Sequence, residues 1–145
     1  MENITEKQLL QKIAEGVNEK ASWIKPVLLL AKDGASYNAC VDSIKEKHKC
    51  RYFTITDATH INFVRINNKL EMEIEGVVCD GHKPEVEVYI QLGTQYYENV
   101  LRYCVNLLEY ENKPVLFIIC EADMNAGEEY IPAWVHSEFE IMRLE

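Results

Sequence analysis

The segment that decides the fold class runs from Lys25 to Ile44 and reads KPVLLLAKDGASYNACVDSI. It opens with a continuous apolar run, Val27–Ala31, which is typical of a central parallel strand covered on both faces. A polar loop with one glycine follows, and apolar residues then recur at helical spacing. Strand, loop and helix in this order form the unit from which α/β sheets are built, so we expect an α/β protein.

The rest of the chain alternates between helical and strand patterns. Thr5 and Gln8 have capping-box spacing, so they predict the start of a first helix. Lys113 and Pro114 stop a later helix and precede the most apolar segment of the chain, just as Lys25 and Pro26 precede the first strand. The patterns predict helices over residues 5–21, 94–111 and 132–137, and further strands over residues 51–56, 86–92, 115–120 and 139–144.

A β-hairpin is predicted over residues 61–78. Two asparagines, Asn67 and Asn68, separate its strands, and asparagine tolerates the positive φ that tight turns require. In the second strand, three apolar residues alternate with three glutamates, so we expect a half-buried strand with an acidic outer face. The apolar residues are Leu70, Met72 and Ile74, and the acidic ones are Glu71, Glu73 and Glu75. A helix is the alternative, because Glu, Leu and Met all favour one.

Together the elements predict one domain over residues 1–145. We expect three layers, with a doubly wound, mainly parallel five-stranded sheet and the hairpin as an insertion. A chain of 145 residues is the usual size for a single domain. The sequence contains no low-complexity tract or linker that would divide it.

Composition and charge favour an acidic protein of the cytoplasm. The net charge is −9; residues 1–69 hold 11 Lys/Arg and 8 Asp/Glu, whereas residues 70–145 hold 4 and 16. Because so acidic a half repels phosphates, we expect no nucleic-acid ligand. No apolar run is long enough to span a membrane, and the charged N-terminus is unlike a signal peptide. Five cysteines on apolar faces indicate reduced thiols.

Four segments of the chain resemble parts of the nucleotide-binding core of the AAA+ ATPases. Residues 25–30 resemble the strand that leads into the family's phosphate loop, and residues 86–92 resemble the strand that carries its metal-binding acids. Residues 115–123 resemble the strand that carries a polar sensor residue, and residues 131–141 resemble a segment that ends in Ser-Arg-Phe. The resemblance implies the strand order 5-1-4-3-2, with Val27–Ala31 beside Val115–Cys120.

The residues that perform the family's chemistry are missing. The loop over residues 32–39 has no Gly-Lys-Ser/Thr, and Asp33 would repel a phosphate. After the third strand, residues 91–94 offer no carboxylate for magnesium. Glu138 stands where the resemblance expects an arginine. These departures predict a degenerate domain that hydrolyses no ATP, and we expect no cofactor.

A crevice beside the phosphate-loop position is nevertheless the expected ligand site, since α/β proteins bind ligands at the carboxyl ends of their strands. Its candidate residues are Lys32, Asp33, Gly34, Ser36, Asn38, Glu121 and Asp123. Cys79 and His82 have the spacing of half a zinc site, but isolated cysteines are more often buried packing residues. We therefore expect no metal site and name no catalytic residue.

Three functions fit the sequence. The first is an inactive AAA+-like domain that binds a protein partner or a second copy of itself, possibly through its acidic C-terminal half. Trp23, Tyr130 and Trp134 are candidate anchors for such an interface. The second is a small-molecule or nucleotide binder that uses residues 32–38 without hydrolysis. The third is an enzyme that uses Cys120, with His136 or His82 as a base, or the acidic loop 121–129.

Overall fold

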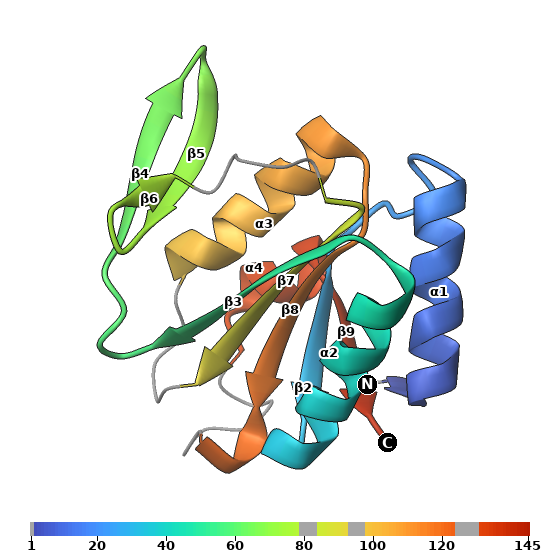
Figure 1. The fold of residues 1–145 in the computed structure, drawn as a ribbon. Coiled ribbons are helices and arrows are strands. Elements are labelled where there is room, and N and C mark those ends of the chain that lie inside the picture. The colour runs from blue at the N-terminus through green and yellow to red at the C-terminus, as the bar shows by residue number, and fades with distance from the viewer. Residues whose placement is uncertain (1, 79–83, 93–97, 124–130) are drawn as a thin grey trace.

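A computed structural model describes residues 2–78, 84–92, 98–123 and 131–145 of the chain. Its main sheet has six strands, all parallel (Figure 1). Both ends of the chain lie at one side of this sheet, where the first strand pairs with the last. In spatial order the strands are β1 (Glu2–Ile4), β9 (Glu140–Leu144), β2 (Val27–Ala31), β8 (Val115–Cys120), β7 (Val86–Leu92) and β3 (Cys50–Thr56).

Helices cover both faces of the sheet (Figure 1). On one face α1 (Glu6–Asn18) packs beside α2 (Gly34–Lys47). On the other face lie α3 (Glu98–Glu111) and the short α4 (Ala133–Glu138), which are joined by a hydrogen bond from Trp134 Nε1 to Glu98. A 3₁₀ turn, η1 (Glu121–Asp123), follows β8. The expected α/β class with a mainly parallel sheet and helices on both faces is confirmed.

The centre of the sheet is formed by its most apolar segments. Every residue of β2 and of β8 is buried, and the two strands pair directly from Val27↔Leu116 to Ala31↔Cys120. A strand buried on both faces needs a continuous apolar sequence, and these two segments provide it. The five predicted strands lie in the order 5-1-4-3-2, as expected.

The expectation of five strands is wrong, because β1 adds a sixth at the edge beside β9. This strand has only three residues, too few to show a period of two, and its pairing partner lies at the far end of the chain. The first helix, α1, follows its N-cap Thr5 with the predicted capping box, but it ends at Asn18, three residues before the predicted end. Residues 94–97 of the predicted third helix lie outside the described residues.

The hairpin is present, so the helical alternative is wrong. Strands β4 (Ile61–Ile66) and β5 (Lys69–Ile74) pair antiparallel around Asn67 and Asn68, whose φ angles are 54° and 64°. A bend at Glu75 and Gly76 interrupts the predicted second strand and sends β6 (Val77–Val78) back along β5. Figure 1 shows this small sheet standing beside α3, apart from the main sheet.

One prediction of an exposed polar face is wrong at a single residue. Glu71 in β5 is buried instead of facing solvent. In β7, Glu87 and Gln91 are as buried as Val86 and Val88, because helices cover both faces of the main sheet. A buried glutamate in a central strand requires charged partners close to its carboxylate.

Candidate functional site

The predicted ligand-site residues meet at the carboxyl edge of the main sheet. Lys32, Asp33 and Gly34 follow β2, and Glu121 follows the neighbouring β8. From this point the chain turns toward β3 after β2 and toward β9 after β8. Doubly wound sheets place their ligands at such a switch point, and these predicted residues lie at this edge.

Asp33 fills the position that a phosphate would need. Its Oδ1 accepts hydrogen bonds from the Ser36 backbone N, at 2.9 Å, and from Ser36 Oγ, at 2.8 Å. The hydrogen bonds from Ser36 and the charge of Lys32 lower the pKa of the Asp33 carboxyl, so it is an anion at neutral pH. A carboxylate therefore already caps the start of α2, where a bound phosphate would otherwise accept hydrogen bonds.

The remaining residues of the predicted site do not form a pocket with Asp33. Glu121 lies within 3.3 Å of Arg143 in β9, an ion pair that spans the end of β2. Lys32 and Asn38 are exposed. Asp123 lies in η1, and its side chain is not among those described. The structure thus places Asp33, Gly34 and Ser36 together, whereas Glu121 is held by a different partner.

A buried charge cluster lies on the α3 side of the sheet, and no sequence pattern predicts it. Glu87 is fully buried, and its Oε1 accepts hydrogen bonds from Arg51 Nε at 2.8 Å and Tyr89 OH at 2.9 Å. Lys113 Nζ lies 2.8 Å from its other oxygen, Oε2. A second Arg51 nitrogen, Nη2, also contacts Oε1. We name Arg51, Glu87, Tyr89 and Lys113 the Glu87 cluster.

The Glu87 cluster is built to hold strands together. Burial opposes the positive charge of Arg51, but the Glu87 carboxylate outweighs it and raises the pKa of the guanidinium. Burial, reinforced by Glu87, also raises the pKa of the Tyr89 hydroxyl. Because Arg51 belongs to β3, Glu87 to β7 and Lys113 to the turn before β8, the cluster joins three successive elements. A fully buried carboxylate held by two cations has no access to a substrate, so we assign it a structural role.

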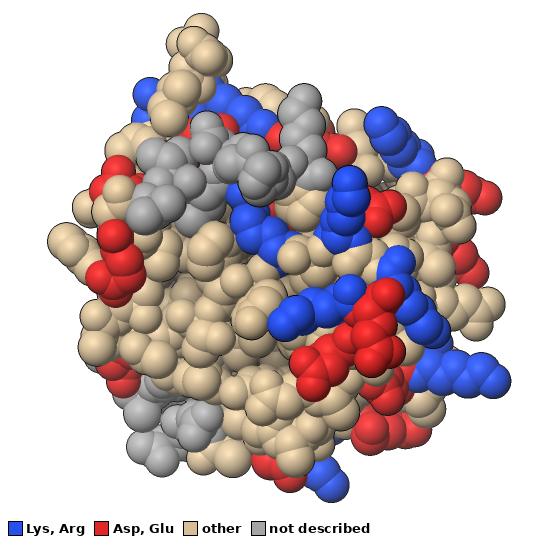
Figure 2. Space-filling view, in the orientation of Figure 1, with Lys and Arg blue, Asp and Glu red and all other residues tan. Residues whose placement is uncertain are grey.

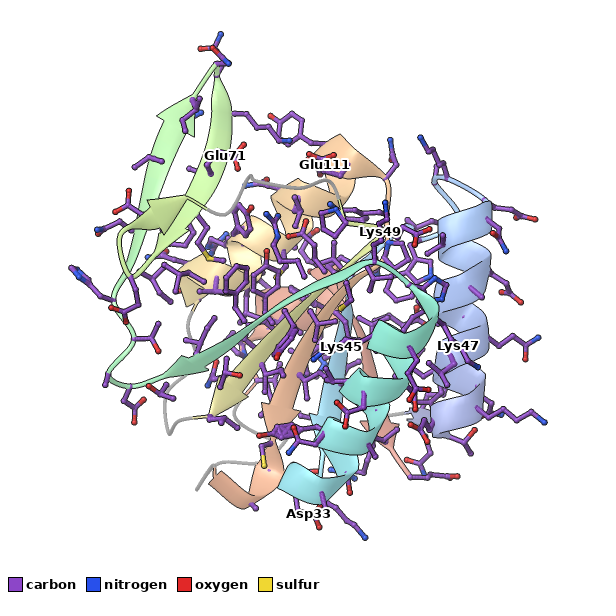
Figure 3. All side chains as sticks on the ribbon, viewed as in Figure 1. Asp33, Lys45, Lys47, Lys49, Glu71 and Glu111 are labelled. Atoms are coloured by element: carbon purple, nitrogen blue, oxygen red, sulfur yellow. The ribbon has the colours of Figure 1, made fainter. Side chains whose placement is uncertain are left out.

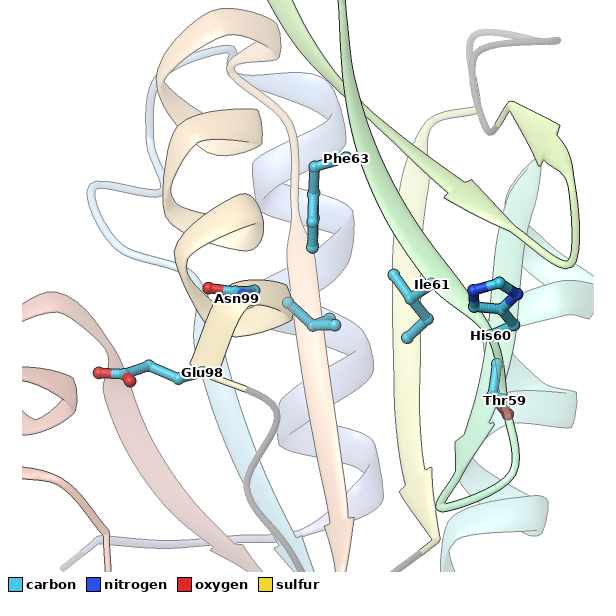
Figure 4. A pocket seen from close by; sticks show the side chains of 7 residues that line it. Thr59, His60, Ile61, Phe63, Glu98 and Asn99 are labelled. Atoms are coloured by element: carbon cyan, nitrogen blue, oxygen red, sulfur yellow. The ribbon is translucent and has the colours of Figure 1, made fainter.

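A cleft of about 410 Å³ opens between the hairpin and the start of α3 (Figure 4). Apolar side chains from β4 and α3 lie on one part of its wall, and polar side chains lie on another. Its lining residues are Thr59, His60, Ile61, Phe63, Glu98, Asn99 and Val100. None of them is a predicted site residue, because the two contributing segments lie far apart in the chain and share no motif.

Three of the described cysteines, Cys40, Cys50 and Cys104, are not activated for chemistry. Burial raises the pKa of Cys40 to about 12 and that of Cys50 to about 11, and it holds the pKa of Cys104 well above its usual range. A thiol nucleophile requires the opposite shift, since the thiolate is the reactive form. Cys120 is buried at the end of β8. The zinc half-site at Cys79 and His82 and most of the acidic loop 121–129 lie outside the described residues.

Comparisons of this chain with protein-family models, with curated proteins and with solved structures give no match. The resemblance to the AAA+ core is therefore carried only by the four sequence segments and by the strand order of the main sheet. Among the described residues, no three His, Cys, Asp or Glu side chains are grouped to hold a metal ion. No helix in the described ranges has the length and apolar character needed to cross a membrane.

Proposed function

We propose that the protein is a non-hydrolysing domain that works by binding another protein. The observation that supports the absence of nucleotide hydrolysis is the Asp33 cap on α2. Phosphate binding at such a loop needs free backbone N–H groups and a positive helix end. Here the Ser36 N–H and hydroxyl are both bonded to a carboxylate on the same loop.

Among the described residues at this edge, no group of side chains could hold the metal that phosphoryl transfer needs. The reaction needs a cation on the transferred phosphate and a metal to neutralise developing charge. Ser36 Oγ, the hydroxyl nearest to the helix start, donates to Asp33. Gln91, at the end of β7, is a buried amide that supplies no charge for a metal. A degenerate AAA+-like relationship, which we retain as part of the proposal, would explain a core of this strand order without its catalytic residues.

The acidic half of the chain offers less docking charge than its composition suggests. Two of its glutamates, Glu71 and Glu87, are buried. Others form ion pairs within the protein: Glu98 with Arg102, Glu111 with Lys69, Glu121 with Arg143 and Glu140 with Lys12. Figure 2 shows acidic and basic side chains interspersed on one side of the face that it presents, beside a broad uncharged area. A partner is therefore recognised by a local surface and not by the net charge.

Calorimetry and a phosphate-release assay with magnesium and ATP or GTP test this function. We expect no heat of binding and no phosphate release above that of buffer. Loss of a metal and of a phosphate-binding cation each removes several kcal/mol of transition-state stabilisation, and about 1.4 kcal/mol is a factor of ten in rate. Micromolar magnesium-dependent ATP binding that disappears in Lys32→Ala would show that the loop is a working nucleotide site.

A second candidate function, small-molecule binding, is favoured by the cleft beside α3. Its volume of about 410 Å³ lies in the range of ordinary ligand pockets, roughly 300–1,000 Å³. Its lining combines three apolar residues with four polar ones, which suits a small amphipathic molecule. A fragment screen by ligand-observed NMR tests this candidate, with Ile61→Glu as the variant that should abolish binding. Fragments that bind equally well to Ile61→Glu would exclude the cleft.

A further inference from the structure

β3 forms one edge of the main sheet and pairs on one side only, with β7. Thr56 shows which way the peptide groups of this strand point. Its backbone N donates to Thr59 Oγ1 at 2.9 Å, and its backbone O accepts from Thr59 N at 3.1 Å. Both groups of Thr56 are therefore used by the following loop and not by β7.

Because a strand alternates the direction of its peptide groups, residues two apart point the same way. The backbone groups of Tyr52 and Thr54 therefore also point away from β7. No other described strand pairs with them. Both side chains are exposed, and the Tyr52 side chain retains 44% of its accessible surface. In the part of the chain that the structure describes, β3 thus has backbone donors and acceptors at Tyr52 and Thr54 that no neighbouring strand uses.

Positive charge flanks this open edge. Lys45, in the last turn of α2, lies over the Tyr52 ring, with Nζ 4.3 Å from the ring centroid. Lys49 directly precedes β3. Because side chains alternate between the two faces of a strand, the Lys49 side chain lies on the opposite face of the sheet from Tyr52. Figure 3 places Lys45 on the side of α2 toward β3, Lys49 at the start of β3, and Lys47 on the other side of α2. Within the described ranges, the Nζ atom of each of these three lysines has no carboxylate oxygen within 4.0 Å, while the Lys49 backbone N donates to Glu85 Oε1 at 3.0 Å.

We propose that the β3 edge docks an extended, acidic segment of a partner protein, which adds a seventh strand to the sheet. The proposal rests on the protein-binding function proposed for the chain and names the surface that performs it. Backbone hydrogen bonds at Tyr52 and Thr54 supply affinity, as in other cases of strand addition. Lys45 and Lys49 select acidic side chains on the two faces of the added strand. A second copy of β3 would fit less well, since Cys50–Thr56 contains no acidic residue.

Two capped decapeptides are the probes: one repeats Glu-Glu-Val-Val, which places acidic side chains on both faces of a strand, and one repeats Lys-Lys-Val-Val. We expect the acidic peptide to bind, with affinity that falls as salt rises, and the basic peptide not to bind. On binding, the amide protons of Tyr52 and Thr54 should become protected from hydrogen exchange. The Lys45→Ala/Lys49→Ala variant should bind the acidic peptide roughly tenfold more weakly, because each exposed ion pair contributes only a modest energy.

Two variants distinguish binding at the β3 edge from non-specific attraction between the acidic peptide and a positively charged surface. Thr54→Pro removes an N–H that points away from the ladder, a position where edge strands tolerate proline, and it should abolish binding. Lys47→Ala removes an equal charge on the far side of α2 and should leave binding unchanged. Equal weakening by Lys47→Ala and Lys45→Ala/Lys49→Ala, or binding without protection of Tyr52 and Thr54, would overturn the docking edge.

Three further outcomes would count against the proposal in different ways. If the protein binds neither the acidic peptide nor nucleotides, β3 is excluded as the docking edge, but the proposed function is not excluded. Nucleotide binding would overturn the proposed function whatever the peptides do. Self-association in sedimentation that Thr54→Pro abolishes would assign the edge to a second copy of the chain and exclude an acidic partner.

Discussion

At the scale of single residues, Gly16 shows how a small side chain sets the packing of α1. A Cβ built on Gly16 would lie 2.6 Å from Trp23 Nε1 and 2.7 Å from Pro114 Cγ, both in rigid rings. Trp23 is itself held by a hydrogen bond of 3.0 Å from Nε1 to the Lys12 carbonyl. The glycine therefore allows the loop after α1 to close over the helix.

We predict that Gly16→Ala destabilises the protein, although alanine is the better helix former. Overpacking costs roughly 1–3 kcal/mol, and the gain in helix propensity is about 1 kcal/mol, so the net loss should be about 1 kcal/mol. Urea unfolding measures it. Gly34→Ala is the matched control, because a Cβ there meets only Tyr37 Cε2 at 3.8 Å. A Gly16→Ala protein as stable as Gly34→Ala would contradict the packing.

Asp33 predicts a dependence of stability on pH. Its pKa is lowered from the usual 3.8 in the folded protein, chiefly by the backbone hydrogen bond from Ser36. A lowered folded pKa means that the carboxylate stabilises the fold above the unfolded pKa and that this contribution is lost as pH falls through the folded value. Asp33→Ala should lower the urea midpoint at pH 7 but not at pH 2. Asp33→Asn, which keeps a cap acceptor, should stay closer to the wild type at pH 7.

At the scale of elements, the turn between β4 and β5 depends on left-handed backbone at Asn67 and Asn68. Asn68→Gly removes the strain of that conformation and should stabilise the hairpin or leave it unchanged. Asn68→Ala should destabilise it by about 1 kcal/mol, since alanine disfavours positive φ. Amide hydrogen exchange of β4 and β5 is the measurement. Slower exchange in Asn68→Ala than in Asn68→Gly would show that the turn is misassigned.

The Glu87 cluster makes a stronger prediction for the junction of β3, β7 and β8. Removing one partner of a buried charge network leaves the others uncompensated, at a cost of about 3–5 kcal/mol. Glu87→Ala should therefore unfold at a much lower urea concentration than the wild type. Glu140→Ala removes a surface ion pair with Lys12 and should cost less than about 1 kcal/mol. Similar losses in the two variants would place Glu87 in solvent and not in the core.

At the scale of the whole molecule, continuous apolar runs and turn chemistry made part of the fold predictable from the sequence. The buried strands β2 and β8, the capping box at Thr5 and the hairpin at Asn67–Asn68 belong to this part. Long-range pairing without a local pattern was not predictable. β1 needs a partner at the opposite end of the chain, and Glu87 is buried only because Arg51 and Lys113 arrive from other elements.

The candidate site likewise contains some features that the sequence could predict and others that it could not. Lys32–Gly34 and Glu121 meet because parallel strands end at one edge, so their common location could be predicted from the order of the strands. The Asp33–Ser36 capping interaction joins residues only three apart, so it depends on local sequence and not on tertiary arrangement. Three other features depend on the tertiary arrangement, and no sequence motif predicts them. They are the ion pair of Glu121 with Arg143, the cleft beside α3 and the open edge of β3.

One amide-resolved NMR titration tests the central claim, a binding domain without a nucleotide site. The labelled protein is titrated first with magnesium and ATP, and then with the acidic Glu-Glu-Val-Val repeat peptide. We predict no change at the amides of residues 33–38 in the first step, and shifts centred on Tyr52 and Thr54 in the second. Saturable, magnesium-dependent shifts at Gly34 and Ser36 with ATP, and none at β3 with the peptide, would contradict this claim.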